Sequence, residues 1–226
     1  QEGGDWHVGM IAPHCYQHLE PVLAPSCRFL HDRMLQAAYE SLSEAQRQQA
    51  HLRIGRLLLQ HYDQHEIAQE LFGIISQLNL GLALISDETE RRELAQLNLQ
   101  ASKQAKHASV WDAALGYANT GVELLICIGG DSDSNKEGTS SWKSDYALNF
   151  ELHLMQIECE FLASNHEQGQ VLAEALLKQA HTPVEKARIC FLLTSQQATL
   201  ELDYCITQGL IGLAYCGLQV PKISQV

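Results

Sequence analysis

Proline is almost missing from the central part of this sequence, where Pro183 is the single proline between residues 40 and 220. Because proline lacks the amide hydrogen that a helical turn needs and its ring collides with the preceding turn, its scarcity leaves helix propagation uninterrupted. The chain has 226 residues and is 46% hydrophobic, which is enough to bury one core or two small ones. The sequence therefore predicts an all-α fold.

Downstream of residue 88, small and apolar residues recur every three or four positions, the spacing of one buried helix face. They form three helix pairs, whose second helices begin near residues 110, 166 and 203. One interval is close to the roughly 34-residue tetratricopeptide period. The other is lengthened by a Gly-, Ser- and Asp-rich loop from Gly129 to Asp145. We predict tetratricopeptide-like repeats over residues 89–226; the alternative is an irregular helical bundle.

Small residues in the second helices let antiparallel helices approach closely, and each pair must stack on a neighbour to bury its apolar face. Pro183 is suited to the first turn of a helix that we expect to reach about Leu202. The predicted buried positions are Leu94, Leu97, Ala101, Ala105 and Ala108 with Ala114, Ala118 and Gly121; Phe150, Leu154, Ile157 and Phe161 with Gly169, Ala173 and Leu176; and Ile206, Leu210 and Leu213 in the last helix.

Two further helices are predicted before the repeats. Ser43 is a suitable N-cap for a helix that continues to about Tyr62, and a second helix is expected from Glu66 to Leu84. Residues 1–30 contain three prolines and the pair Gly3-Gly4, so they are compatible with short strands or an irregular end. The residues expected to point from the Ser43 helix toward a core are Leu52, Ile54, Leu57, Leu58 and Leu59.

Charge and hydropathy narrow the classes of partner. No apolar run approaches the roughly 18 to 20 residues that cross a bilayer, and the N-terminal residues lack the basic-then-apolar order of a signal peptide, so we expect no membrane partner and a cytoplasmic location. The net charge is −12, and residues 61–226 contain 21 acidic and ten basic residues. Since nucleic-acid binders neutralise phosphates with clustered Lys and Arg, we expect no nucleic-acid partner.

The sequence offers ligand-capable side chains without a convincing metal site. Seven cysteines form an odd set with no CxxC pair, which favours neither a disulfide framework nor a zinc site. His14, Cys15 and His18, with His7 nearby, have ligand-like spacing, but no second ligand pair of the usual spacing follows. His61 and His65 flank Asp63, an arrangement that more often marks a solvated helix end. We predict no metal.

Catalytic motifs are missing from the sequence. It contains no G-x-S-x-G elbow and no G-x-x-x-x-G-K-[ST] phosphate loop. Glu158 and Glu160 are two residues apart, so on a helix they face different directions and cannot cooperate as acid and base. We predict that the chain is not an enzyme, with no catalytic residues and no cofactor of its own.

The segment RFLHDRMLQAAY from Arg28 to Tyr39, followed by HLRIGRLLL from His51 to Leu59, resembles bacterial multidomain signalling proteins of the STAND type. The resemblance continues through LFGIISQLNLG (71–81), ELAQLNL (93–99) and GLQVP (217–221), and it spans almost the whole chain. In such proteins an input module such as a protein-kinase-like region precedes an AAA-type ATPase, and a sensor histidine kinase or cyclase often follows.

This resemblance implies an order of parts. Residues 1–62 would be the end of a winged-helix module that closes an upstream ATPase, residues 63–88 a helical linker, and residues 89–226 the tetratricopeptide-like repeats. Residues 1–27 match the family poorly, so the winged-helix module would be a truncated remnant. His31 occupies the position of a nucleotide-sensing histidine in the intact parent, which would bind ATP or ADP with magnesium. A simpler interpretation is that His31 and Asp32 merely open the following helix.

The leading functional hypothesis is a non-catalytic, protein-binding segment that couples an ATPase module to a signalling output in a multidomain kinase or STAND-type regulator. Its partner would be a neighbouring domain or another signalling protein. The expected interaction surface lies on first helices and includes Glu93, Gln96, Gln100 and Lys103. The alternative is the effector-sensing part of a DNA-binding transcriptional regulator. Within the loop, Trp142 is expected to be a partly buried aromatic anchor.

Overall fold

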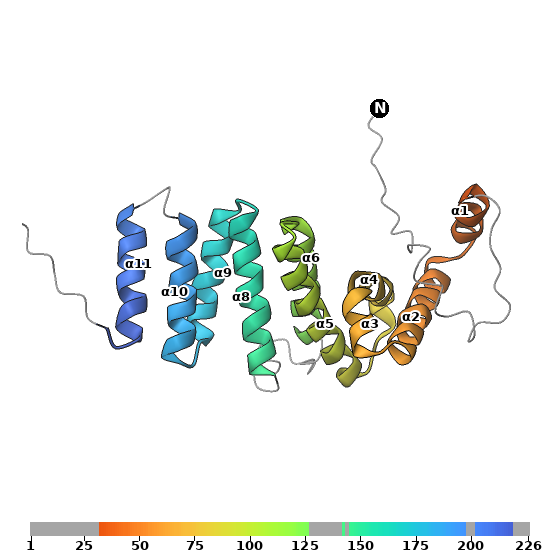
Figure 1. The fold of residues 1–226 in the computed structure, drawn as a ribbon, viewed down its shortest axis with the longest axis horizontal. Helices are drawn as coiled ribbons and strands as arrows, with labels where there is room; N and C mark the ends of the chain where they lie inside the picture. Colours follow the sequence, from red (N-terminus) through yellow and green to blue (C-terminus); the bar gives the residue numbers. More distant parts are fainter. Residues whose placement is uncertain (1–31, 127–141, 143–144, 198–201, 219–226) are drawn as a thin grey trace, which may run out of the picture. The chain divides into compact units, whose positions relative to one another are not determined.

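The computed structural model describes residues 32–126, 142, 145–197 and 202–218, and every regular element in these ranges is helical (Figure 1). The predicted all-α class is therefore confirmed for the described residues. Residues 1–31, half of the predicted winged-helix remnant (1–62), lie outside them. The elements are α1 (Asp32–Glu40), α2 (Glu44–His61), α3 (Gln64–Gln69), α4 (Leu71–Leu80), the 3-10 turn η2 (Leu82–Leu84), α5 (Glu88–His107), α6 (Trp111–Ile126), α8 (Tyr146–Leu162), α9 (His166–Gln179), α10 (Pro183–Gln197) and α11 (Leu202–Tyr215).

Contacts divide the chain into two units, residues 1–97 and 98–226. The division falls within α5, whereas the domain boundaries expected from the sequence lie at residues 62 and 88. None of the described helices is both long and apolar enough to cross a membrane.

In the first unit, α2 begins as its sequence predicts. The amide of Gln46 donates to Ser43 Oγ at 3.4 Å, and the Ser43 amide donates to Gln46 Oε1 at 2.9 Å, which completes a capping box. Of the five residues expected to face a core, Leu52 and Leu58 are buried, and the other three are half-buried. The buried face of α2 packs against α4, where a Cβ on Gly55 would lie 2.6 Å from Leu78 Cδ2.

The prediction of a single helix from Glu66 to Leu84 is wrong, because the helical conformation is interrupted twice. Asp63 caps the short α3 by accepting from the amides of His65 and Glu66, and α3 ends before Glu70. No residue of α3 is buried, whereas α4 buries five, and the change of direction at Glu70 lets α4, rather than α3, pack on α2. The second break follows Gly81, whose backbone passes directly against α2.

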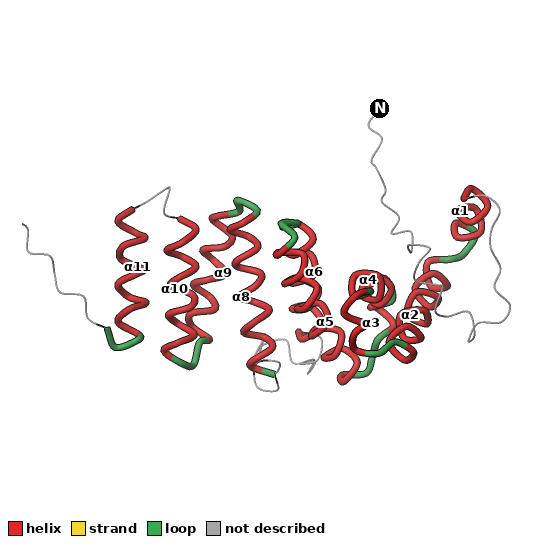
Figure 2. The backbone as a smooth tube through the Cα atoms, in the orientation of Figure 1, coloured by secondary structure: helices red, strands yellow, loops and turns green. Residues whose placement is uncertain are grey.

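The second unit repeats one type of turn. Ser109 and Ser164 have left-handed φ values of 61° and 66°, and Gly217 has 77°. The amide of the next residue donates a hydrogen bond of 2.8–3.0 Å to the carbonyl oxygen five residues earlier. These bonds run from Val110 to Ala105, from Asn165 to Glu160 and from Leu218 to Leu213. This is the Schellman arrangement that ends a helix and reverses the chain. It connects α5 to α6 and α8 to α9, so two helix pairs are closed in the same way (Figure 2).

The predicted buried faces of α6, α8 and α9 are confirmed. In α8, Phe150, Leu154, Ile157 and Phe161 are all buried, and they form one core with residues of α9 and α10. Gly169 of α9 is required by close approach, since a Cβ there would lie 2.8–3.1 Å from three atoms of the Phe161 ring. In α5, Leu94, Ala101 and Ala105 are buried and Leu97 is half-buried. Ala108 is exposed, because α5 ends at His107.

The predicted buried face of the last helix is wrong. Ile206, Leu210 and Leu213 are 51%, 45% and 39% exposed. Cys205 and Gly212 are buried instead, and a Cβ on Gly212 would lie 3.0 Å from Cys190 Cβ of α10. The small residues lie inward because α10 and α11 approach too closely for larger side chains. The described part of the preceding helix reaches Gln197, and Leu202, its predicted end, is the first residue of α11.

Candidate functional site

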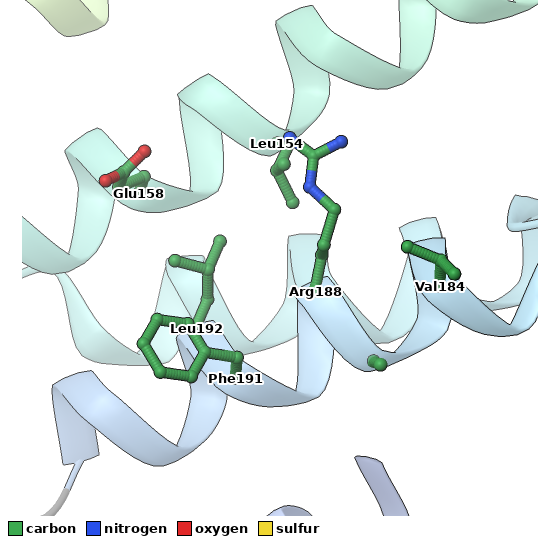
Figure 3. Close-up of a pocket in the computed structure, with 7 residues that line it drawn as sticks. Leu154, Glu158, Val184, Arg188, Phe191 and Leu192 are labelled. Carbon is green, nitrogen blue, oxygen red and sulfur yellow. The ribbon is translucent and has the colours of Figure 1, made fainter. Parts of the chain in front are cut away.

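A groove of about 380 Å³ lies between α8 and α10, the first helices of the last two pairs. Figure 3 shows Phe191 and Leu192 on α10 beside the stretch of α8 that carries Leu154 and Glu158. Most of its lining is aliphatic or aromatic. The lining residues are Leu154, Glu158, Val184, Ala187, Arg188, Phe191 and Leu192.

The groove has a buried floor and an exposed apolar edge. Leu154 and Leu192 are buried in the core that α8, α9 and α10 share. Phe191 and Val184, by contrast, are 68% and 64% exposed, the two most exposed large apolar side chains described. An aromatic side chain left this open next to a concave apolar surface is typical of an anchor point for a protein partner.

The sequence of α10 explains why Phe191 points outward. The run Ile189-Cys-Phe-Leu-Leu193 contains five consecutive apolar residues. Successive side chains on a helix are separated by about 100°, so five of them point all round the axis and cannot share one buried face. Four of the five are buried, and only Phe191 faces solvent; the buried ones are Ile189, Cys190, Leu192 and Leu193. Sequence reasoning missed the groove, although this run was the available signal.

Ion pairs lie beside the groove. Lys106 Nζ donates to Glu158 Oε1 at 2.9 Å, and the Arg188 guanidinium donates to both carboxylate oxygens of Glu151 at 2.6 and 3.2 Å. The bond to Glu151 raises the pKa of Arg188. The Arg188 guanidinium also lies over the Phe150 ring, 5.6 Å from its centroid. These contacts hold the charged groups in place and leave the apolar edge available.

A hydrogen-bond network fixes the start of α10. The amides of Thr182 and His181 donate to Glu185 Oε2 at 2.8 and 3.0 Å, and the Tyr146 hydroxyl of α8 donates to the same oxygen at 2.8 Å. The Tyr146 ring stacks on His181 with centroids 4.1 Å apart. Burial raises the pKa of Glu185, but these hydrogen bonds outweigh burial and the net pKa is lowered. Burial, and then the bond to Glu185, raises the pKa of Tyr146.

The lowered pKa of Glu185 leads to a pH-dependent stability. A carboxyl whose pKa is lower in the folded state stabilises the fold at pH values above its unfolded-state pKa, which is about 4.3 for Glu. That contribution is lost as the pH falls through the folded-state pKa. We expect Glu185→Gln to lower the melting temperature at about pH 7, with the gap to the unsubstituted chain closing toward about pH 3. Glu167→Gln is the control, since its carboxylate accepts no hydrogen bond from any described residue. A gap that is constant with pH would contradict the network.

Trp142 lies against α8, as predicted for a partly buried anchor. Its ring centroid is 5.1 Å from that of His153 and 5.7 Å from that of Tyr146, and the side chain packs on the core of α8, α9 and α10. Burial lowers the pKa of His153, because it disfavours the charged form of the ring. The rest of the predicted loop lies outside the described residues, apart from Asp145.

The other candidate residues named from the sequence either lie outside the described residues or are exposed. His31, His14, Cys15 and His18 lie outside the described residues. His61 and His65 are exposed, and no group of three potential ligands converges in the part of the chain that the structure describes. The predicted interaction residues Glu93, Gln96, Gln100 and Lys103 are all exposed on α5, and none of them lines the groove.

One cysteine and two glutamates of the second unit, side-chain types that can act in catalysis, have structural roles. Burial raises the pKa of the Cys159 thiol to about 11, so at neutral pH it is a protonated core residue. Glu158 pairs with Lys106, whereas Glu160 accepts from Asn165 Nδ2 at 2.8 Å. The two carboxylates therefore engage different neighbours, as their two-residue spacing predicts.

Comparison with known proteins gives one informative match. Over 198 residues the chain is 28% identical to the hybrid signal transduction histidine kinase G of Dictyostelium discoideum. The match covers 80% of this chain and 6% of that protein, so the chain spans a small fraction of its relative's length. No model of a known protein family matches the chain, and no solved structure matches it either.

Proposed function

We propose that this chain is a non-catalytic, protein-binding segment of a multidomain signalling protein, and that the groove between α8 and α10 is where it binds. The exposed Phe191 beside the buried floor of Leu154 and Leu192 is the observation that carries the proposal. The similarity to a hybrid signal transduction histidine kinase supports the signalling context.

The repeats themselves are part of the proposal. Helix pairs that are closed by the same Schellman turn, and that share cores with the next pair, support a tetratricopeptide-like array over residues 89–226. In such an array the first helices line one surface. Within the second unit, the groove between the first helices α8 and α10 would then belong to the surface on which Gln100 and Lys103 were expected.

The wider role follows from the family resemblance. In a cytoplasmic STAND-type protein, the segment would follow an ATPase that binds ATP or ADP with magnesium, and His31 would sense the nucleotide. Residues 1–62 would close that ATPase as the end of a winged-helix module. The helix pairs would then pass the state of a bound partner to the ATPase or to a kinase output. The small share of the relative that the chain covers fits one part of a longer protein.

The proposal is tested in the full-length signalling protein, with kinase autophosphorylation as the measured output. Deletion of residues 90–220 should change the regulation of that output, and Phe191→Asp should reproduce the change because it places a charge on the apolar edge. Val171→Asp on α9 is the matched control, since Val171 is a similarly exposed aliphatic residue that does not line the groove. If the deletion leaves regulation unchanged, the coupling role is wrong.

A further inference from the structure

The connection between α9 and α10 exposes a threonine that is followed by proline. Thr182 precedes Pro183, and the sequence contains no other serine or threonine directly before a proline. The other four prolines follow Ala12, Glu20, Ala24 and Val220. His181, Thr182, Pro183 and Val184 are all exposed. The side chain of Thr182 is therefore accessible to an enzyme that approaches from solvent.

The sequence Thr182-Pro183 suits a particular class of protein kinase. Pro183 is the first residue of α10 and has no amide hydrogen. A kinase that is apolar where it contacts the residue after the acceptor would leave an amide hydrogen there without a partner, so it selects proline. Residues 180–182 lie outside both helices, and Ala180 is extended, with φ −65° and ψ 124°. The acceptor hydroxyl is therefore on a connection rather than inside a helix.

A carboxylate lies next to the Thr182 hydroxyl. Glu185 Oε2 accepts from the Thr182 amide at 2.8 Å, and Thr182 Oγ1 accepts from the Glu185 amide at 3.2 Å. A phosphate on Oγ1 carries about −1.5 to −2 charges at pH 7, so it would repel this carboxylate across one capping box. Tyr146 and His181 donate to the same oxygen, and both lose this acceptor if Glu185 moves away.

The network around Glu185 fixes the turn that carries Val184. Val184 lines the groove between α8 and α10, and Figure 3 shows it on the same stretch of α10 as Arg188. The repulsion therefore acts on the part of α10 that presents the apolar edge of the groove. A phosphate on Thr182 also adds a strongly hydrated charge within one helical turn of Val184, where a partner needs an apolar contact.

We propose that Thr182 is a phosphorylation site for a proline-directed serine/threonine kinase, and that the phosphate loosens the first turn of α10 and weakens binding in the groove. In the reaction the Thr182 oxygen forms a bond to the γ-phosphorus of ATP, and the bond from that phosphorus to the bridging oxygen breaks, which releases ADP. The hydroxyl proton passes to the catalytic base of the kinase. The effect on binding rests on the proposed function, whereas the modification itself does not.

Incubation of the 226-residue chain with ATP and a purified mitogen-activated protein kinase, a proline-directed enzyme, tests the site. Trypsin releases residues 179–186 as the peptide QAHTPVEK, in which Thr182 is the one residue with a hydroxyl group, so mass spectrometry locates the phosphate. We expect close to one phosphate per chain in this peptide. Pro183→Ala keeps the hydroxyl and should lower the initial rate at least tenfold. Thr182→Ser is the matched control and should still be phosphorylated.

Three results would overturn the site. These are a peptide 179–186 that carries no phosphate, a Pro183→Ala variant that reacts as fast as the unsubstituted chain, or a synthetic peptide of residues 176–189 that is phosphorylated while the folded chain is not. The last result would mean that the fold hides Thr182 from the kinase. Circular dichroism of the variants verifies that the helices are retained.

The repulsion between the phosphate and Glu185 has its own test. Phosphorylation of the unsubstituted chain should lower the melting temperature by about 2 to 4 °C at pH 7. In Glu185→Gln the like charge is missing, and a negative charge at the start of a helix is favourable, so phosphorylation should raise the melting temperature instead. Equal shifts in the two backgrounds would contradict the repulsion.

Regulation is tested in the full-length signalling protein, with kinase autophosphorylation as the output. Treatment with the proline-directed kinase should change the output in the same direction as Phe191→Asp, and Thr182→Val, which has no hydroxyl group, should abolish this response. If Phe191→Asp changes the output and phosphorylation of Thr182 does not, the regulatory part of the inference is wrong and the groove stands. If Thr182 is phosphorylated but Phe191→Asp has no effect, the proposed function fails while the phosphorylation site stands.

Discussion

Substitution of Gly81 by alanine should destabilise the chain by about 1 to 3 kcal/mol, the cost of forcing an extra methyl group into a well-packed contact. A Cβ at this position would lie 2.6 Å from Leu52 Cβ, 3.0 Å from Leu52 Cα and 2.9 Å from the carbonyl oxygen of Gln48. These atoms belong to the backbone of α2 or are attached directly to it, so they cannot rotate away. Gly81 has φ of −99°, which any residue adopts, so the close approach alone requires glycine here.

Urea denaturation followed by circular dichroism measures this loss. Gly116→Ala is the matched control, and it should change the unfolding free energy in the opposite direction. Gly116 lies inside α6 and a Cβ there would meet no atom within 4 Å, so the substitution gains helix propensity without a clash. We expect a gain in unfolding free energy of about 0.8 to 1 kcal/mol. If Gly81→Ala also stabilised the chain, the packing of the α4 terminus against α2 would be wrong.

The second large effect is a difference in stability between variants of Ile157 and Phe191. It distinguishes a residue that stabilises the fold from the residue proposed to bind a partner. Ile157 of α8 is fully buried in the core shared with α9 and α10. Truncation to alanine removes buried methyl groups and leaves a cavity, so Ile157→Ala should cost about 2 to 5 kcal/mol, and Ile157→Val about 0.5 to 1.5 kcal/mol. Phe191→Ala removes a larger side chain from α10, yet Phe191 is 68% exposed.

We therefore expect Phe191→Ala to change the free energy of unfolding by less than about 1 kcal/mol, well below the 3 to 5 kcal/mol typical of a buried phenylalanine. Denaturant titrations of the three variants under identical conditions provide the comparison. A loss above about 2 kcal/mol for Phe191→Ala would show that the ring supports the core, and the groove would lose its proposed anchor.

Local sequence signals predicted several individual helices well. In α8 and α9 the stripes identified by spacing, Phe150 to Phe161 and Gly169 to Leu176, are buried. A second buried stripe of α8, which includes Met155 and Cys159 and packs against α5 and α6, was not predicted. The N-cap of α2 was predictable because it is local: Ser43 and Gln46 satisfy each other's amides within four residues. The two breaks around α4 depend on how α4 and η2 meet α2, which no local pattern records.

The candidate site was less accessible from the sequence than the fold. Catalytic and metal-binding sites depend on recognisable residue types at recognisable spacings, which are visible in a sequence. An apolar groove uses the same residue types as a core, so Leu154 and Leu192 of the groove were indistinguishable from their buried neighbours until α8 and α10 were placed side by side. The four exposed residues expected on α5 stay a prediction.

The sequence by itself determined that the described part of the chain is helical, and it identified buried stripes on α6, α8 and α9, because proline scarcity and three- to four-residue spacing act within single helices. Only the tertiary structure decided which face of α11 is buried. That helix carries a small stripe, Cys205 and Gly212, beside a large aliphatic stripe, Ile206 and Leu210. Hydrophobicity favours burial of the large stripe, but the close approach of α10 admits only the small one, and the aliphatic side chains are left facing outward.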